Sequence, residues 1–145
     1  MMLAIPNSDR RAQRRDATKA EILDAAWEIC RADGLAALSL RDVAKRVGMQ
    51  APSLYSYFDS KNAIYDAMFG QAWSEYLQVC RDSEASIPKP ARKAMLAMVE
   101  TFVDFALADH ARFQLMNQRV VFDFQPTPKS YARPLQVMSR CRARL

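Results

Sequence analysis

The chain has 145 residues, 50% hydrophobic and 26% charged, and its formal net charge is +5 at pH 7. This profile is typical of a globular, mostly helical protein with one domain, or a small domain joined to part of another. Its three cysteines lie far apart without a C-x-x-C pair, so neither a disulfide framework nor a zinc site is indicated. The mildly basic balance permits a polyanion partner without requiring one.

Two apolar stretches are candidates for a targeting or membrane segment. Residues 1–15 have too short an apolar run before their arginines to form a secretory signal. The later stretch, residues 94–108, is interrupted by Glu100 and Asp104 and is too short to span a bilayer. We therefore expect a protein of the cytoplasm with reduced thiols.

The first predicted helix follows the capping box Thr18-Lys19-Ala20-Glu21, in which the side chains at each end satisfy backbone amides. Apolar residues then recur at the spacing of one helical face, at Ile22, Ala25, Ala26, Ile29 and Cys30. Gly34 is expected to end this helix as a left-handed C-cap. The arginines before the capping box, within residues 1–16, are predicted to form a flexible basic arm.

A second, short helix is predicted from the N-cap Ser39 to Gly48. A tight turn follows, and Pro52 fits the first turn of a third short helix that runs to about Phe58. Asp59 and Ser60 then cap a long fourth helix, whose inward-facing residues include Ile64, Ala67, Met68, Ala72, Trp73, Tyr76, Leu77 and Cys80.

The rest of the chain predicts further helices and no strand. Residues 86–90 form a linker, and the helix of about residues 91–109 is apolar around much of its circumference, which predicts a central place in a bundle. A sixth helix is expected at about 111–122, and another helical pattern begins at Tyr131 after Pro126 and Pro128. The predicted fold is all-α: an N-terminal three-helix domain joined through a long fourth helix to a helical bundle.

Two short helices separated by a glycine turn and packed on a longer helix form a helix-turn-helix arrangement, whose second short helix enters the DNA major groove. Leu54 and Phe58 would anchor that helix. Gln50 and Ser53 are then candidates for base-edge hydrogen bonds. The other expected DNA contacts are apolar contacts to thymine methyls by Ala51 and Pro52, sugar and phosphate contacts by Tyr55 and Tyr57, and phosphate contacts by Arg41 and Lys61. The N-cap Ser39 is also a candidate DNA-binding residue.

The run from Leu38 to Ala67, LSLRDVAKRVGMQAPSLYSYFDSKNAIYDA, resembles the DNA-binding domain of the TetR (tetracycline-repressor) family of bacterial regulators. The resemblance covers roughly residues 15–70. It rests on the Ile22 to Gly34 helix, on Val43-Ala44 and Val47-Gly48, and on Ser53-Leu54-Tyr55, Tyr57-Phe58 and Lys61. It implies that residues 17–62 form the DNA-binding domain and residues 63–145 a ligand-binding and dimerisation domain.

The resemblance implies a repressor that binds a palindromic operator as a homodimer and is released by a small-molecule effector. Family members usually carry several more helices, and the last two form their dimer interface, so the second domain appears incomplete. A truncated regulator without operator binding of its own is therefore an alternative.

The effector would bind among large apolar side chains of the second domain, because methionine and aromatic side chains adapt to flexible ligands. The candidates are Trp73, Tyr76, Met98, Phe102, Phe105, Phe113 and Met116. A helical stripe of such residues is more often plain core, and that alternative stays open. Tyr55 and Tyr57 could likewise be packing residues, and Arg41 and Lys61 solvated charges.

An enzyme is not indicated, because no nucleophile–histidine–carboxylate set, metal-ligand spacing or glycine-rich phosphate loop can be found. No cofactor is expected. An all-helical interaction module without DNA contact is a second alternative. It would explain the bundle but would leave Pro52, Tyr55 and Tyr57 without a role on the surface.

Overall fold

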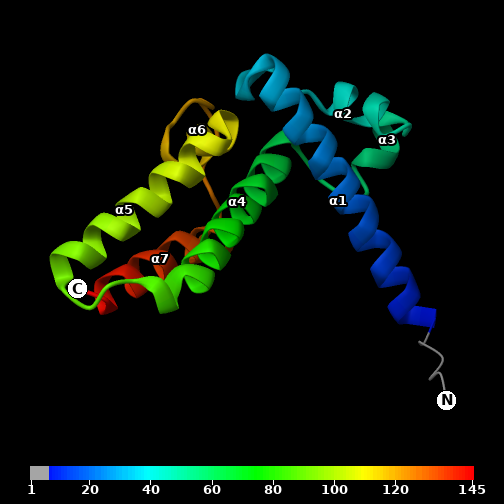
Figure 1. The fold of residues 1–145 in the computed structure, drawn as a ribbon. Coiled ribbons are helices and arrows are strands. Elements are labelled where there is room, and N and C mark those ends of the chain that lie inside the picture. Colours follow the sequence, from blue (N-terminus) through cyan, green and yellow to red (C-terminus); the bar gives the residue numbers. More distant parts are fainter. Residues whose placement is uncertain (1–6) are drawn as a thin grey trace. The chain divides into compact units, whose positions relative to one another are not determined.

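The structure is a computed structural model that describes residues 7–145 (Figure 1). This part of the chain contains helices and no strand, so the predicted all-α class is confirmed. The chain divides into two compact units, one of residues up to Ile64 and the other of Tyr65–Leu145. None of the helices in the described range is long and apolar enough to cross a membrane.

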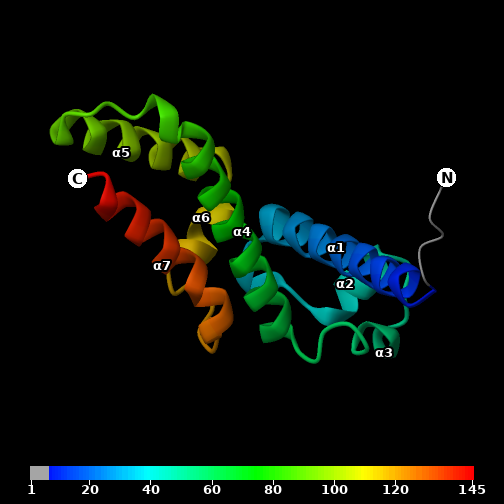
Figure 2. The ribbon, with the colours of Figure 1, turned by 90° about the horizontal axis from the view of Figure 1, so that it is seen from below.

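The first unit is built on one long helix, and two short helices lie along it (Figures 1 and 2). The long helix contacts both the short segment that follows it and the first short helix, which contacts the second. Its elements are α1 (Asn7–Asp33), the 3-10 helix η1 (Leu35–Ala37), α2 (Leu40–Arg46) and α3 (Ala51–Leu54). Ile22, Leu38, Val43 and Leu54 are almost fully buried and form the centre of its core.

The N-terminal end of α1 differs from the prediction. The helix begins at Asn7, so residues 7–16 are helical, and the prediction of a flexible arm there is wrong; residues 1–6 lie outside the described range. Thr18 is inside the helix, where its hydroxyl donates to the carbonyl of Arg14 at 3.0 Å. Residues 10–15 are all arginine, alanine or glutamine, which have high helix propensity, so the helix continues through the apparent capping box.

The long helix α4 (Lys61–Ser83) begins in the first unit and continues into the second. Its start is capped as predicted, because the hydroxyl of Ser60 accepts a hydrogen bond from the amide of Ala63 at 3.1 Å. Ile64, Met68 and Tyr76 are buried as expected. Tyr65 and Phe69 are buried too, although the sequence pattern did not single them out.

The second unit continues after α4 with η2 (Glu84–Ser86), α5 (Ala91–Ala108), α6 (His110–Asn117) and α7 (Pro128–Ala143). Aromatic rings join α4 to α5: the centroid of Tyr76 lies 5.3 Å from that of Phe102 and 5.0 Å from that of Phe105. Arg112 of α6 pairs with Glu75 of α4 at 3.2 Å. The packing of the second unit thus centres on the side of α4 that carries these residues.

The helix α5 is not central, which corrects the prediction from its composition. Ala94 is its only residue that is buried within the described structure. Besides its charged residues, α5 exposes large apolar side chains that recur at helical spacing: Met95, Leu96, Val99, Val103 and Leu107. Apolar residues occur all around α5, but the described residues cover only the side that meets α4 and α6.

The last two helices also start or end differently from the prediction. The helix α6 ends at Asn117, so Val120 and Val121 lie outside it. The helix α7 begins at Pro128 rather than at Tyr131. Thr127 caps α7 by accepting from the amide of Ser130 at 3.3 Å, and proline in the first turn sacrifices no helical hydrogen bond.

A single carboxylate fastens the start of α7 to α4. Asp66 accepts three hydrogen bonds: from the amide of Thr127 at 2.7 Å, from the hydroxyl of Thr127 at 3.0 Å and from the hydroxyl of Ser130 at 2.8 Å. Hydrogen bonds to an ionised acceptor are stronger than neutral ones. Asp66 therefore fixes where α7 begins.

We predict that Asp66→Ala lowers the free energy of unfolding by about 1–3 kcal/mol, because it removes a charged acceptor shared by three donors. Urea unfolding followed by far-UV circular dichroism measures the change. Asp104→Ala, which removes an exposed carboxylate from α5, is the matched control and should change stability by less than about 0.5 kcal/mol. Equal losses in both variants would contradict this role for Asp66.

Candidate nucleic-acid interface

The first short helix starts at a reciprocal cap. The hydroxyl of Ser39 accepts from the amide of Asp42 at 3.1 Å and donates to the Asp42 carboxylate at 2.6 Å. Val43 and Ala44 turn the other face of α2 into the core. Arg41 and Lys45, one helical turn apart, are left exposed on the surface.

The turn between the two short helices depends on Gly48, whose φ is 70°. Its amide donates to the carbonyl of Lys45 at 3.3 Å, and the amide of Met49 donates to the carbonyl of Ala44 at 2.9 Å. Residues with a Cβ rarely adopt this left-handed conformation. Gln50 then takes the N-cap position of α3 without making a side-chain cap bond, which leaves its amide group exposed.

The second short helix is anchored at its back and exposed at its front. Leu54 is fully buried and Phe58 is 8% exposed, as predicted for the two anchors. Ser53 is exposed, and Tyr55 is 52% exposed. Only residues 51–54 are α-helical, but the amides of Tyr57 and Phe58 still donate to the carbonyl of Leu54, at 2.9 and 3.0 Å.

Arg15 of α1 reaches the segment that follows α3. Its guanidinium lies 5.0 Å from the ring centroid of Tyr57 and donates to the backbone carbonyl of Ser56. Lys19 similarly lies 5.7 Å from the ring centroid of Phe58. Tyr57 is half-buried by these contacts. No local sequence pattern indicates this link, because Arg15 lies within the stretch predicted to be an arm.

The residues expected to contact DNA are mostly on the surface. Ser39, Ala51 and Tyr57 are half-buried, and the exposed ones are Arg41, Gln50, Pro52, Ser53, Tyr55 and Lys61. An open hollow between α2 and α3 is lined by Arg41, Ala44, Lys45, Gly48, Met49, Gln50 and Ala51. The hollow thus brings together three of the residues expected to contact DNA, namely Arg41, Gln50 and Ala51. Lys45 and Met49 were missed, although the spacing from Arg41 to Lys45 could have identified the lysine.

The candidate effector residues do not surround one cavity. Five of them form a connected aromatic cluster, with centroid distances of 5.0–6.3 Å among Trp73, Tyr76, Phe102, Phe105 and Phe113. Met98 lines a cavity with Tyr76, whereas Met116 lines a separate hollow with Phe69. The indole nitrogen of Trp73 is buried and has no hydrogen-bond partner within the described structure.

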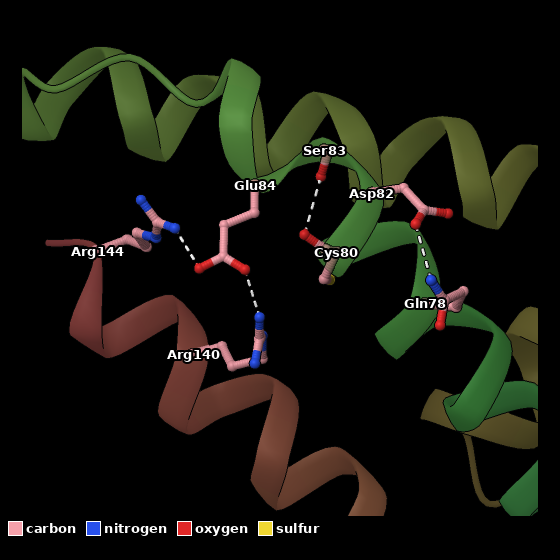
Figure 3. Close-up of polar contacts among 7 residues, drawn as sticks. All are labelled: Gln78, Cys80, Asp82, Ser83, Glu84, Arg140 and Arg144. Atoms are coloured by element: carbon pink, nitrogen blue, oxygen red, sulfur yellow. Dashed lines mark hydrogen bonds and ion pairs between the residues drawn. The ribbon is translucent and has the colours of Figure 1, made fainter.

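The cavity beside Tyr76 is lined by residues from the end of α4, η2, α5 and α7. Figure 3 shows the Glu84 carboxylate between the guanidiniums of Arg140 and Arg144, and each of them donates to it. The hydrogen bond from Arg144 has the largest effect and lowers the pKa of Glu84, and the bond from Arg140 lowers it further. Desolvation raises this pKa and so acts against the two bonds. Glu84 and both arginines were not among the predicted site residues, although Arg140 in the last turn of α7 and its C-cap Arg144 are four positions apart.

Burial affects the other titratable groups of this cavity. It raises the pKa of Cys80 and that of Tyr76 above their ordinary values, and the two side chains share a hydrogen bond. Neither group is therefore poised to ionise near neutral pH. Across residues 7–145, no group of three His, Cys, Asp or Glu side chains is placed to hold a metal ion.

Two short helices, a left-handed glycine between them and an exposed α3 front define a helix-turn-helix protein. Residues 22–68 match the sequence profile of the TetR family of bacterial regulatory proteins, and this range includes all of α2 and α3. The predicted resemblance to the TetR family is thus confirmed for residues 22–68.

Two curated relatives are helix-turn-helix regulators. The chain is 27% identical over 97 residues to the uncharacterized transcriptional regulator YobS of Bacillus subtilis, a match that covers 67% of this chain and 50% of YobS. It is 29% identical over 110 residues to the transcriptional activator FasR of Mycolicibacterium smegmatis, covering 74% of this chain and 50% of FasR. The chain thus spans about half the length of each of these curated relatives.

The fold is also found in solved structures. The crystal structure of SCO4313, described as a regulatory protein, superposes with a TM-score of 0.75 and 28% sequence identity. The superposition covers 88% of this chain and 60% of SCO4313. Because 88% of the chain is included, the likeness extends beyond the helix-turn-helix to helices of the second unit.

We predict that Gly48→Ala lowers the free energy of unfolding by about 1–2 kcal/mol, because a Cβ strains the left-handed backbone. No atom lies within 4 Å of the place that this Cβ would take, so the loss should come from the backbone and not from a clash. Gly48→Asn should lose less, since asparagine tolerates this conformation better. Thermal unfolding of the two variants measures the difference, and an alanine variant as stable as the parent would contradict the assignment.

Proposed function

We propose that this chain is a sequence-specific DNA-binding transcriptional regulator that places the N-terminal end of α3 in the major groove. The proposal rests on one observation: the exposed Ser53 and Tyr55 lie on a short helix whose opposite side is fixed by Leu54 and Phe58. Helix-turn-helix proteins dock such a helix by its first residues. A DNA partner places the protein in the cytoplasm.

The roles of the side chains follow from their chemistry and exposure. Gln50 and Ser53 hydrogen-bond base edges, and Ala51 and Pro52 contact thymine methyls. Tyr55 and Tyr57 contact sugar and phosphate, and Arg41 and Lys61 hold phosphates that fix the register of the protein on the duplex. Ser39 lies next to Arg41 at the start of α2 and contacts DNA there. Lys45, exposed one turn after Arg41, adds a further phosphate contact.

The second unit has the regulatory role in this proposal. A small effector binds among α4 to α7, and α4 transmits the effect because it continues from the second unit into the first. The effector can release DNA only if its affinity differs between the DNA-binding state and the released state. The buried, unpaired indole nitrogen of Trp73 supports a ligand role, since it offers a donor to such a molecule.

We infer a repressor that binds a palindromic operator as a homodimer. The relative FasR is named an activator, so activation is the second candidate. A reporter gene placed behind the operator decides between them by the sign of its response. The TetR relatives are regulators, and no catalytic role is assigned to this chain.

An interaction module without DNA contact remains the competing function. Titration of the chain with DNA at two salt concentrations separates the alternatives. A groove binder that neutralises several phosphates loses affinity steeply as salt rises, because its binding releases counterions. An interaction module has little DNA affinity to lose.

We predict that Tyr55→Ala weakens binding to all duplexes by about tenfold, or ~1.4 kcal/mol, because it removes a backbone contact. Ser53→Ala should instead change the ratio of affinities between sequences, since its hydroxyl faces base edges. Fluorescence anisotropy with a set of duplexes measures both effects.

The control for these variants is Tyr131→Ala, which removes an equally exposed tyrosine (50%) from the second unit. It should leave DNA affinity unchanged. Unchanged affinity in Tyr55→Ala would show that the assigned docking face is wrong, even if the protein binds DNA elsewhere.

We predict that two copies of the chain bind one palindromic duplex, because half-sites about 34–36 Å apart are read by the two recognition helices of a dimer. Sedimentation equilibrium with and without a duplex from beside the gene measures the stoichiometry. A duplex with one half-site scrambled serves as the control and should bind much more weakly. Tight binding of a single copy to both duplexes would contradict the dimer.

A further inference from the structure

We propose that Arg140 and Arg144, with the apolar side chains beside them, bind a small amphipathic anion that has one carboxylate or phosphate group on a short apolar chain. The inference rests on the proposed function, because it names the class of effector that the second unit would take. The site is the cavity between α4, α5 and α7 described above.

The two guanidiniums hold a carboxylate already, which shows that a carboxylate fits between them. Glu84 accepts from Nη2 of Arg140 through one oxygen and from Nη2 of Arg144 through the other (Figure 3). A guanidinium has five N–H donors in a planar fork. Each arginine therefore uses a small part of its donor capacity on Glu84.

The charges around this carboxylate favour an added anion. Two arginines face one glutamate, and Glu84 is the only acidic residue that lines the cavity within the described structure. The nearby Asp82 points away from the arginines in Figure 3 and accepts from Gln78 at 2.7 Å. The cavity wall thus carries an excess of one positive charge.

The ion pairs of Glu84 with Arg140 and Arg144 are exposed enough to water for another anion to replace the glutamate. The side chains of Arg140 and Glu84 are 40% and 37% exposed, so water reaches both partners. Ion pairs at such positions contribute little net stability. A soluble anion can therefore replace Glu84, or share the arginines with it, at small cost.

The remaining wall of the cavity suits a short apolar chain. Tyr76 and Met98 line it from α4 and α5, and Ile87 lines it from the segment between these helices. The hydroxyl of Thr101 donates to the carbonyl of Ala97 at 2.8 Å. This part of the wall thus offers mostly apolar surface to a ligand.

Exchange at Glu84 also supplies a route for regulation. Glu84 is the first residue of η2 and directly follows the last residue of α4, Ser83. A ligand that replaces Glu84 as the ion-pair partner of both arginines breaks the link between the end of α4 and the end of α7. Because α4 begins in the first unit, its two ends connect the ligand site to the helix-turn-helix.

Isothermal titration of the full chain with hexanoate, hexyl phosphate and hexan-1-ol tests the site. We expect at least one anion to bind about tenfold or more tightly than the alcohol, and the better of the two identifies the head group. Equal binding of all three compounds, or binding of none, would overturn the proposal.

Variants separate the arginine pair from general basicity. Arg140→Gln and Arg144→Gln should each weaken anion binding about tenfold, whereas the control Arg142→Gln, an exposed arginine of the same helix that does not line the cavity, should not. Glu84→Gln should strengthen binding, because it removes the competing carboxylate. Loss of fold would not increase affinity, so weaker binding in Glu84→Gln, or an equal loss in Arg142→Gln, would count against the site.

The regulatory role is tested apart from the site. DNA affinity is measured with and without the anion that binds, on the parent chain and on Arg140→Gln. A decrease in DNA affinity with the parent alone supports the regulatory role, and an unchanged affinity overturns it. A chain that binds the anion but no DNA would refute the proposed DNA-binding function and leave the anion site standing.

Discussion

The exposed front of α3, which we propose as the DNA-docking face, depends on the burial of Leu54 and Phe58 behind it. A helix as short as α3 is not stable by itself, because nucleating a helix costs more than its few hydrogen bonds return. Its position is therefore set by tertiary packing: Leu54 is fully buried, and Lys19 of α1 lies against the ring of Phe58. Arg15 adds a hydrogen bond to the backbone carbonyl of Ser56, just after α3. Ser53 and Tyr55 lie on the opposite side of α3. They point outward because Leu54 and Phe58 fix the position of the helix.

The features that could be predicted from the sequence are those with short-range causes. Ser39, Gly48 and Ser60 act on their own backbone or on residues three positions away, so their types and spacing were sufficient. The start of α1 was misplaced because a capping box can also lie inside a helix when strong helix formers precede it. The bond between Arg15 and Ser56 joins residues 41 positions apart, and no local pattern records it.

The second unit was predicted less well because composition does not say which side of a helix is covered. Apolar residues all around α5 suggested a central helix, yet Leu96, Val99 and Val103 are exposed. A contiguous exposed apolar surface of this kind is typical of a place where proteins contact other molecules. The ligand-binding role of the aromatic candidates stays a prediction. Tyr76 and Phe102 do come together, but they pack on each other, as core residues do.

The arginine pair illustrates why a candidate ligand site can escape a search for large apolar residues. The predicted ligand residues are methionines and aromatic rings, whereas the excess positive charge of this cavity comes from the arginines at the end of α7, of which Arg140 lies 56 residues beyond Glu84. A buried ion pair would resist a ligand, because removing one partner leaves an unpaired charge away from water. This pair is open to water, so its arrangement can change without that penalty. An ion pair that contributes little to stability, next to the end of a helix shared by both units, is well suited to respond to a ligand.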